Sequence, residues 1–337
     1  MIEKVRWGVI GTANIALTKV IPAMQAGEYG FVLAIASRDP ETARRAADEL
    51  GLARSYGSYD ELLADREIEA VYIPLPNHLH VEWSIRAAEA GKHVLCEKPI
   101  GLNANEARKL IEARDRTGMK IQEAFMMRTH PQWLGAIDLI RSGRVGELRA
   151  INGFFSYFND DPSNVRNQLD IGGGGLMDIG CYCVNISRWS FGSEPRRVIG
   201  MIDRDAATGI DRLTSAMLEF PVGQATFTCS TQMVPFQRVE FLGTRGRVEV
   251  QIPFNIPTSS PTVIMVDDGS DLYRKNIETI TFDAANQYTI QSDLFSRSIR
   301  EGTEQAMPLE DSFGNMAVID AIFRSAESGN WESPDTL

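Results

Sequence analysis

Residues 5–16 read VRWGVIGTANIA, and this stretch decides the fold of the first part of the chain. The apolar run Val5–Ile10 has the length of a short buried strand, and it stops at Gly11 before a helix-like pattern. Gly11, Ala13 and Ala16 stand at the small-residue positions of a Gly-x-Gly-x-x-Gly/Ala turn. Such a turn lets the backbone approach a pyrophosphate at the N-terminus of a helix, so it indicates a dinucleotide site. Because alanine at position 13 departs from the usual glycine, the turn alone also fits an ordinary tight turn.

The alternation of strand and helix patterns continues to about residue 123. Short apolar runs recur, each followed by a helical pattern or a loop: Phe31–Ala36, Ala70–Ile73, His93–Cys96 and Met119–Ala124. Short apolar strands that alternate with helices are typical of a parallel sheet covered on both faces. We therefore predict an α/β fold, with a doubly wound Rossmann domain that binds NAD(P) over residues 1–123.

The pattern changes near Arg128. Leu148–Phe158 alternates in the manner of a strand, Leu176–Trp189 reads as a helix, and residues 196–282 are mostly strands with hairpin turns. Runs of strands with few helices suggest a mostly antiparallel sheet. Residues 124–337 are therefore predicted to form an α+β domain.

Composition and charge exclude several classes of protein. The 337 residues are 43% hydrophobic and 23% charged, which is ordinary for a soluble globular chain of about two domains. The net charge of −11 and the absence of long basic runs argue against nucleic-acid binding. No stretch reaches the ~20 apolar residues of a membrane span, and no signal peptide is visible, so we expect a cytoplasmic protein. The four cysteines lack zinc-site spacing and are predicted to be small buried side chains in a reducing compartment.

The end of the second predicted strand bears on the choice of cofactor. NAD-binding turns usually place an acidic residue there for the ribose hydroxyls, whereas this chain has Ser37 and Arg38. A hydroxyl and a guanidinium can both bind a 2′-phosphate, which a carboxylate would repel. Asp39, one step further on, is a plausible helix cap. We therefore favour NADP, with NAD as the alternative and a solvated surface charge as the alternative role of Arg38.

Two further loops lie where an open parallel sheet binds ligands, beyond the carboxyl ends of its strands. They carry Leu75, Pro76, Asn77, His78 and His80 after one strand and Glu97, Lys98 and Pro99 after the next. Four histidines in all, with no acidic partner at ligand spacing, give little support to a metal site, and none is predicted. We expect His80 to sit at the start of its helix and to shape the loop. The candidate cofactor site comprises Leu75, Pro76, Asn77, His80, Glu97 and Lys98 of these loops, Ser37, Arg38 and the turn residues Gly11, Thr12, Ala13, Asn14 and Ile15.

The chain resembles, over nearly its whole length, the Gfo/Idh/MocA family of glucose–fructose oxidoreductase, inositol dehydrogenase and the rhizopine catabolism protein. The markers are the turn at Gly11, Pro76-Asn77-x-x-His80, Glu97-Lys98-Pro99, and Gly173-Gly174-Gly175 before Asp178 and Gly180. The resemblance implies that Lys98 is the catalytic lysine. It also implies a substrate-binding second domain with a large open-faced sheet, which often forms the subunit interface, and hence a homo-oligomer, either dimer or tetramer.

One position separates branches of this family. Many members have histidine four residues after the aspartate that corresponds to Asp178, whereas this chain has Tyr182, followed by Asn185 where aspartate is frequent. A tyrosine there resembles the branch of glucose–fructose oxidoreductase, NADP-dependent D-xylose dehydrogenase and dimeric dihydrodiol dehydrogenase, and it disfavours inositol dehydrogenases. Further segments look like the same branch: Glu123–Met126, Arg128, His130, Pro131 and Asn164–Arg166.

The chemistry of alcohol oxidation assigns roles to these residues. A hydride acceptor and a base for the hydroxyl proton are needed, and a free tyrosine of pKa ≈ 10 is a poor base at neutral pH. A nearby ammonium stabilises the phenolate, so Lys98 is the candidate activator and Tyr182 the candidate acid and base. Asp178 lies one helical turn earlier on the same face, where it could accept bonds from sugar hydroxyls and pair with Lys98. The alternative is a polar helix face packed against a loop.

The sequence thus predicts an NADP-dependent dehydrogenase for CH–OH groups of a sugar or polyol. The favoured reaction takes C1 of an aldose resembling D-xylose or D-glucose to a lactone. The alternatives are a trans-dihydrodiol dehydrogenase, a sugar–sugar oxidoreductase with tightly bound NADP, and a cofactor-bound regulatory protein. Arg128 could hold substrate hydroxyls or a carboxylate, or form a structural ion pair. Arg166 could reach the cofactor or the substrate.

The strand-rich stretch 212–251 also predicts self-association. Its apolar residues alternate with polar ones, notably at Met217, Phe220, Phe227, Met233 and Phe241. One face of this sheet must cover helices, and the other would leave an apolar patch on a monomer. We therefore expect subunits to associate through this sheet.

Overall fold

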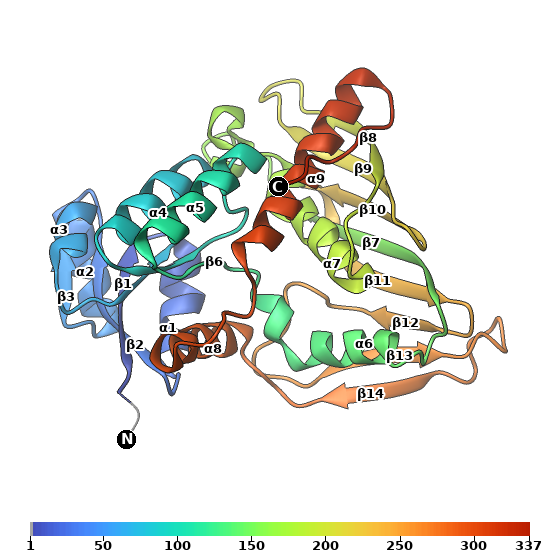
Figure 1. The fold of residues 1–337 in the computed structure, drawn as a ribbon, viewed down its shortest axis with the longest axis horizontal. Coiled ribbons are helices and arrows are strands. Elements are labelled where there is room, and N and C mark those ends of the chain that lie inside the picture. The colour runs from blue at the N-terminus through green and yellow to red at the C-terminus, as the bar shows by residue number, and fades with distance from the viewer. Residues whose placement is uncertain (1–2) are drawn as a thin grey trace. The chain divides into compact units, whose positions relative to one another are not determined.

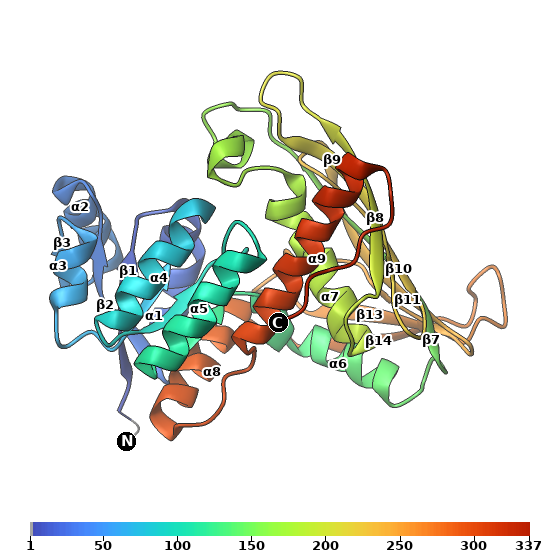
Figure 2. The ribbon, with the colours of Figure 1, turned by 45° about the horizontal axis from the view of Figure 1, so that its top comes forward.

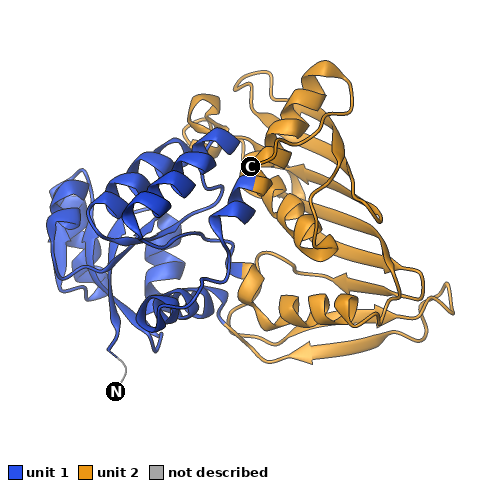
Figure 3. Ribbon diagram, viewed as in Figure 1, with its two compact units in different colours: residues 1–126, 286–313 blue, residues 127–285, 314–337 orange. Residues whose placement is uncertain are grey.

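The computed structural model describes residues 3–337 and divides into two compact units (Figure 1, Figure 2). Unit 1 comprises Met1–Met126 and Asn286–Phe313, and unit 2 comprises Met127–Ala285 and Gly314–Leu337 (Figure 3). The division expected at residue 123 differs from this one, because residues 286–313 return to the first unit. The mixed α/β fold expected from the sequence is confirmed.

Unit 1 is built on a six-stranded parallel sheet in the order β3-β2-β1-β4-β5-β6. This is the strand order of the Rossmann fold, with its topological switch point between β1 and β4. The strands are β1 (Val5–Ile10), β2 (Gly30–Ala36), β3 (Arg54–Tyr56), β4 (Ala70–Ile73), β5 (His93–Cys96) and β6 (Ile121–Glu123). Strand β3 was not predicted, because its three residues Arg54, Ser55 and Tyr56 carry no apolar run.

The helices of unit 1 begin and end where the sequence places its caps. Asp39 and Asn103 accept backbone hydrogen bonds at helix N-termini, while Gly51 and Gly118 end the same helices in the left-handed conformation. The helices are the π-helical turn η1 (Ala16–Val20), α1 (Ile21–Gln25), α2 (Pro40–Leu50), α3 (Tyr59–Ala64), η2 (Asn77–Leu79), α4 (His80–Glu89), α5 (Ala104–Thr117) and α8 (Gln287–Glu301).

Helix α8 belongs to unit 1 because it covers apolar surface beside β1. Phe295 is 1% exposed and packs on Trp7, with ring centroids 5.7 Å apart. The Trp7 indole donates to Ser296 Oγ at 3.0 Å, and the Arg300 guanidinium forms two 2.7 Å hydrogen bonds with Glu69. A sequence pattern of amphipathic helix could not reveal these partners, since they lie more than 200 residues away in the chain.

Unit 2 is built on an eight-stranded sheet in the order β14-β13-β12-β11-β7-β10-β9-β8. Only β7 and β10 pair in parallel; the other neighbours are antiparallel, as expected. The strands are β7 (Leu148–Phe158), β8 (Arg197–Arg204), β9 (Asp211–Glu219), β10 (Gln224–Ser230), β11 (Gln232–Gly243), β12 (Arg247–Val250), β13 (Thr262–Asp267) and β14 (Glu278–Phe282).

Helices cover one face of this sheet (Figure 2). They are α6 (Pro131–Arg141), the π-helical turn η6 (Leu176–Gly180), α7 (Cys181–Phe191) and most of α9 (Leu309–Ser328). Short 3₁₀ turns complete the unit: η3 (Met126–Thr129), η4 (Val165–Asn167) and η5 (Leu169–Ile171). Phe220, Phe227 and Phe241 point to the covered face and are at most 3% exposed.

The four cysteines are unpaired and buried, as the sequence predicts for small apolar side chains. Within residues 3–337, no helix combines the length and the apolar character needed to cross a membrane.

Candidate active site

The turn after β1 requires glycine at position 11. Gly11 has a φ of +112°, and a Cβ added there would lie 2.9 Å from Leu75 Cδ2. Its amide donates to the Ala36 carbonyl at 2.9 Å, which fixes the turn against the end of β2. The predicted residues Thr12–Ile15 follow directly and lead into η1. The backbone therefore forms a tight turn beside Leu75 with no side chain at position 11. Such a turn fits a dinucleotide pyrophosphate.

The end of β2 carries the residues expected to read the cofactor. Asp39 caps α2, and the hydroxyl and amide of Thr42 help to hold its pKa below the usual value. Ser37 is 8% exposed and its hydroxyl accepts from the Asp39 amide at 3.2 Å, while Arg38 is exposed. The predicted role of Asp39 as a cap is confirmed. Since this carboxylate serves the helix, the side chains that fit a 2′-phosphate are Ser37 and Arg38.

The loop that carries Lys98 is anchored by its neighbour Glu97. The Glu97 amide donates to the Ile73 carbonyl at 3.1 Å, and its carboxylate accepts from the Tyr72 phenol at 2.6 Å and from the Lys98 amide at 3.3 Å. Burial, and then the Glu97 charge, raise the pKa of Tyr72 well above 10, so this phenol stays a donor. The Lys98–Pro99 peptide is cis. Glu97 therefore holds the backbone of the lysine loop at the carboxyl end of β5.

His80 lies between the loop that follows β4 and the loop that carries Lys98, and it contacts both. Its ring is fully buried, with Nδ1 2.7 Å from the Pro99 carbonyl oxygen and Nε2 2.7 Å from the Leu75 carbonyl oxygen. Two carbonyl partners favour a protonated ring, whereas burial, together with the Lys98 charge, lowers the pKa of His80 to about 4. A doubly protonated ring donates to both carbonyls and so ties the cofactor loop to the lysine loop, whereas a neutral ring has one N–H and donates to only one of them. These contacts agree with the loop-shaping role expected for His80, and its part in cofactor binding stays a prediction.

In unit 2, Asp178 stands at the centre of a polar cluster. The Tyr157 phenol of β7 donates to Asp178 Oδ2 at 2.5 Å, and Arg166 Nε of η4 lies 3.1 Å from the same oxygen. The Asp178 side chain is 12% exposed, and its charge is the main cause of a raised pKa for Arg166. Two donors thus fix this carboxylate in one orientation while part of it faces solvent.

Tyr182 lies one turn after Asp178, at the start of α7. It is 5% exposed, and its ring packs against Phe155 at 5.9 Å and Phe254 at 5.2 Å between centroids. Arg166 is close enough for the Tyr182 phenol to contribute to its raised pKa. Rigid aromatic walls and a neighbouring cation are a suitable setting for a phenol that handles a proton.

Arg128 contacts two side chains of α7. Its Nη1 donates to Asn185 Oδ1 at 3.0 Å, and its guanidinium stacks over Trp189 at 4.3 Å from the ring centroid. Asn185 is fully buried on α7. Binding of substrate by Arg128 stays a prediction.

The structure therefore gathers the predicted residues into two sets. Unit 1 groups the cofactor candidates and Lys98, and unit 2 groups Asp178, Tyr182 and Arg166. Tyr157 was missed by sequence reasoning, although it lies in the predicted strand Leu148–Phe158. Because side chains alternate between the two faces of a strand, its position places it on the face that the helices cover. That position alone gives little indication of a site residue. Among residues 3–337 no group of three or more histidine, cysteine or acidic side chains is placed to hold a metal ion.

Comparison with known proteins identifies the family. Residues 5–125 match the oxidoreductase family with an NAD-binding Rossmann fold, and residues 133–249 match the GFO/IDH/MocA C-terminal domain. The chain belongs to this family. An uncharacterized oxidoreductase of Rhizobium meliloti is 53% identical over 98% of this chain and 99% of its own length. The NADP-dependent D-xylose 1-dehydrogenase 2 of Haloferax volcanii is 38% identical over 96% of this chain and 98% of its own length.

Solved structures include a similar fold. The 3-ketoreductase KijD10 of Actinomadura kijaniata, in complex with NADP and TDP-benzene, superposes with a TM-score of 0.89 at 29% identity, covering 96% of this chain and 98% of that one. Structures of the same enzyme also exist with a tyrosine replaced by phenylalanine and with a lysine replaced by alanine or glutamate. The protein is thus an NAD(P)-dependent oxidoreductase, as the sequence predicts.

Proposed function

We propose that this protein is an NADP-dependent sugar dehydrogenase that oxidises C1 of an aldose such as D-xylose or D-glucose to a lactone. The observation that carries the proposal is the Asp178 carboxylate, held by Tyr157 and Arg166 on the same helical segment as Tyr182. A fixed, part-exposed carboxylate can accept hydrogen bonds from sugar hydroxyls, and the phenol beside it can accept the proton. The similarity to a D-xylose dehydrogenase supports the choice of substrate.

NADP is the proposed cofactor because its 2′-phosphate suits Ser37 and Arg38. The Gly11 turn and the Leu75–Asn77 loop would hold the dinucleotide, and the Lys98 loop and Arg166 are proposed to complete its site. When bound, the cofactor supplies the nicotinamide ring that accepts the hydride.

The residues of the chain itself handle the proton. Tyr182 takes the hydroxyl proton of the substrate, and cationic Lys98 and Arg166 stabilise the phenolate that this requires. Asp178 orients the sugar through its ring hydroxyls. Phe155 and Phe254 hold the phenol and exclude water from one side of it.

A substrate screen tests this proposal. Aldoses, polyols and trans-dihydrodiols are offered with NADP or NAD, and cofactor reduction is followed by absorbance. We expect turnover of aldoses with NADP and a lactone product. Turnover of dihydrodiols alone, or NADP that copurifies and stays bound through dialysis while one sugar is oxidised and another reduced, would contradict the proposal in favour of the two alternative activities.

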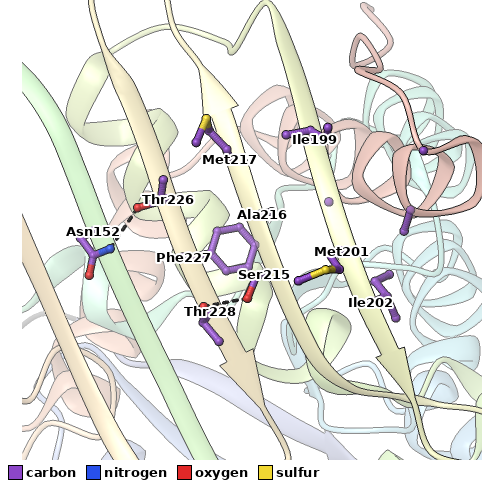
Figure 4. A pocket seen from close by; sticks show the side chains of 13 residues that line it. Asn152, Ile199, Met201, Ile202, Ser215, Ala216, Met217, Thr226, Phe227 and Thr228 are labelled. Atoms are coloured by element: carbon purple, nitrogen blue, oxygen red, sulfur yellow. Dashed lines mark hydrogen bonds between the residues drawn. The ribbon is translucent and has the colours of Figure 1, made fainter.

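We also propose that subunits associate through the uncovered face of the sheet in unit 2. Figure 4 shows side chains of β8, β9, β10 and β7 that line a hollow of about 600 Å³, to which Ala326 and Gly329 at the end of α9 also contribute. Met201, Val234 and Phe236 are 74%, 72% and 44% exposed on strands of this sheet. Burial of such side chains favours association. A monomeric mass by light scattering at micromolar concentration would contradict this. The predicted cytoplasmic location stays a prediction.

A further inference from the structure

Asp211, the first residue of β9, is a buried carboxylate that the mechanism above does not use. It is 1% exposed, and its Oδ2 accepts hydrogen bonds from the Leu176 amide at 2.5 Å and from the Thr214 hydroxyl at 3.1 Å. Burial raises the pKa of Asp211 to about 6, although these bonds and the charge of Arg204 oppose the shift. Burial of an ionised carboxylate is costly, and the two hydrogen bonds offset only part of that cost here.

The other carboxylate oxygen lies against Gly174 in the glycine run that precedes η6 and α7. Gly174 has a φ of +116°, and a Cβ added there would lie within van der Waals overlap of Asp211 Oδ1. The Gly174 amide donates to the Arg166 carbonyl at 2.8 Å, and the Gly174 carbonyl accepts from the Asp178 amide at 3.0 Å. Gly174 is therefore the backbone joint between the two residues that form the Arg166–Asp178 ion pair.

We propose that Asp211 is a positioning residue for the reaction, which fixes the Gly174 joint and so sets the Arg166–Asp178 pair beside Tyr182. The inference rests on the proposed function, because it assumes that this pair binds the substrate. The carboxylate grips the segment on both sides of Gly175: one oxygen holds the Leu176 amide, and the other limits how far Gly174 can move. Two contacts, one on each side of Gly175, define an orientation, which a single hydrogen bond to Leu176 would not.

Asp205, at the other end of the same hairpin turn, provides a matched control. Its carboxylate accepts from the amides of Ala207 and Thr208 at 2.9 Å each, and hydrogen bonds, the largest from the Gln232 side chain, lower its pKa to about 2. Ionised Asp205 therefore stabilises the folded chain at neutral pH, whereas ionised Asp211 does not. The same substitution at these two positions separates a role in stability from a role in positioning.

The experiment compares Asp211→Asn with Asp205→Asn at pH 8. For Asp211→Asn we expect a Tm no lower than that of wild type, since a buried charge is removed. We expect kcat for the sugar to fall by roughly tenfold or more, with an unchanged Kd for NADP, because small misplacements of site groups have large effects on rate. For Asp205→Asn we expect a lower Tm and a kcat within twofold of wild type. A folded Asp211→Asn enzyme with wild-type kcat would overturn the inference.

A second pair of variants decides the matter if Asp211→Asn does not fold. Thr214→Val removes one hydrogen bond to the carboxylate and keeps the shape of the side chain, while Thr214→Ser keeps the hydroxyl. We expect kcat to fall at least threefold in Thr214→Val and to be restored in Thr214→Ser. Equal kcat values in both variants and wild type would contradict the positioning role.

A readout without turnover separates this inference from the proposed function. Trypsin cleavage after Arg166, followed by mass spectrometry, reports how firmly the joint holds this exposed residue. Faster cleavage in Asp211→Asn or Thr214→Val than in wild type supports the positioning role even if no sugar is oxidised, in which case the proposed function alone fails. If cleavage and kcat are both unchanged in these variants, the inference is wrong. Sugar oxidation by the wild-type enzyme would still support the proposed function in that case.

Discussion

The two units build their parts of the site in different ways. In unit 1 the cofactor candidates lie on loops that directly follow β1, β2, β4 and β5, and short segments such as Gly11–Ile15 determine their shape. In unit 2 the Asp178 cluster joins side chains from a strand, a 3₁₀ turn and a helix, at positions 157, 166 and 178. The first kind of site is encoded locally and the second depends on packing between distant segments. Substitutions in the two units should therefore change different measured quantities.

The largest expected effect within unit 1 is on the rate of the chemical step. Lys98→Ala should lower kcat by roughly 10²–10⁴-fold, because it removes the charge that stabilises the phenolate. Lys98→Met keeps most of the shape without the charge and should not restore the rate. The Kd for NADP, measured by fluorescence titration, checks that the cofactor still binds. A Lys98→Met enzyme within threefold of wild-type kcat would show that the charge is not required.

The second prediction concerns the cofactor residues of unit 1, and it is checked by the KM values for NADP and NAD. Arg38→Ala should raise the KM for NADP by about 10- to 100-fold, since a hydrogen bond to a charged group is worth about 1.5–3 kcal/mol. The KM for NAD should change little. Arg45→Ala, on the exposed side of α2, is the control and should leave the ratio of the two KM values unchanged. If wild type uses NAD as efficiently as NADP, the assignment of Ser37 and Arg38 is wrong.

The third prediction concerns Tyr157 of unit 2, whose loss should change sugar turnover and leave cofactor binding unchanged. Tyr157→Phe removes one of the two donors that fix Asp178, so kcat/KM for the sugar should fall by about tenfold. The Kd for NADP should stay at the wild-type value, because Tyr157 belongs to the other unit. Tyr273→Phe, at an 84% exposed position of unit 2, is the control. A loss of NADP affinity in Tyr157→Phe would contradict the proposal that unit 1 binds the cofactor and unit 2 the sugar.

The same contrast explains what the sequence could and could not predict. The strand alternation, the Asp39 cap and the need for glycine at position 11 are local, and spacing was enough to find them. Helix α8 was assigned to the second domain because its partner Trp7 lies 288 positions earlier, and no pattern within the helix records that contact. Tyr157 and Asp211 were missed for a related reason. Their roles come from the pairing of β7 and β9 with neighbouring segments, which position in the chain alone does not reveal.

The smallest expected effect concerns the dependence of stability on pH. The pKa of Asp211 is about 6 in the folded chain and about 3.9 when unfolded, so its contribution to stability rises as the pH falls from 6 to 4. The charge of Arg204 favours the ionised form of this carboxylate, while burial, and then the Asp211 charge, keep the neighbouring Cys229 thiol neutral by raising its pKa. Asp211→Asn cannot gain this proton. The difference in unfolding free energy between the variant and wild type should therefore shrink by on the order of 2 kcal/mol over this range.

Thermal or denaturant unfolding at several pH values measures this difference. Asp205→Asn provides the opposite case, because the pKa of Asp205 is about 2 and its contribution to stability is lost as the pH falls from about 4 towards 2. If the difference in unfolding free energy between Asp211→Asn and wild type does not change between pH 7 and pH 4, burial does not raise the pKa of Asp211.

The most direct test of the central claim is the pH profile of kcat for sugar oxidation by wild type and Tyr182→Phe. If the phenol moves the proton, Tyr182→Phe keeps the ring that packs on Phe155 and Phe254 but should lower kcat by roughly 10²–10⁴-fold. The wild-type profile should rise with pH through an ionisation that is absent from the variant, and the Kd for NADP should be the same in both. A Tyr182→Phe enzyme within threefold of wild type, with the rising limb of its pH profile intact, would show that another group moves the proton.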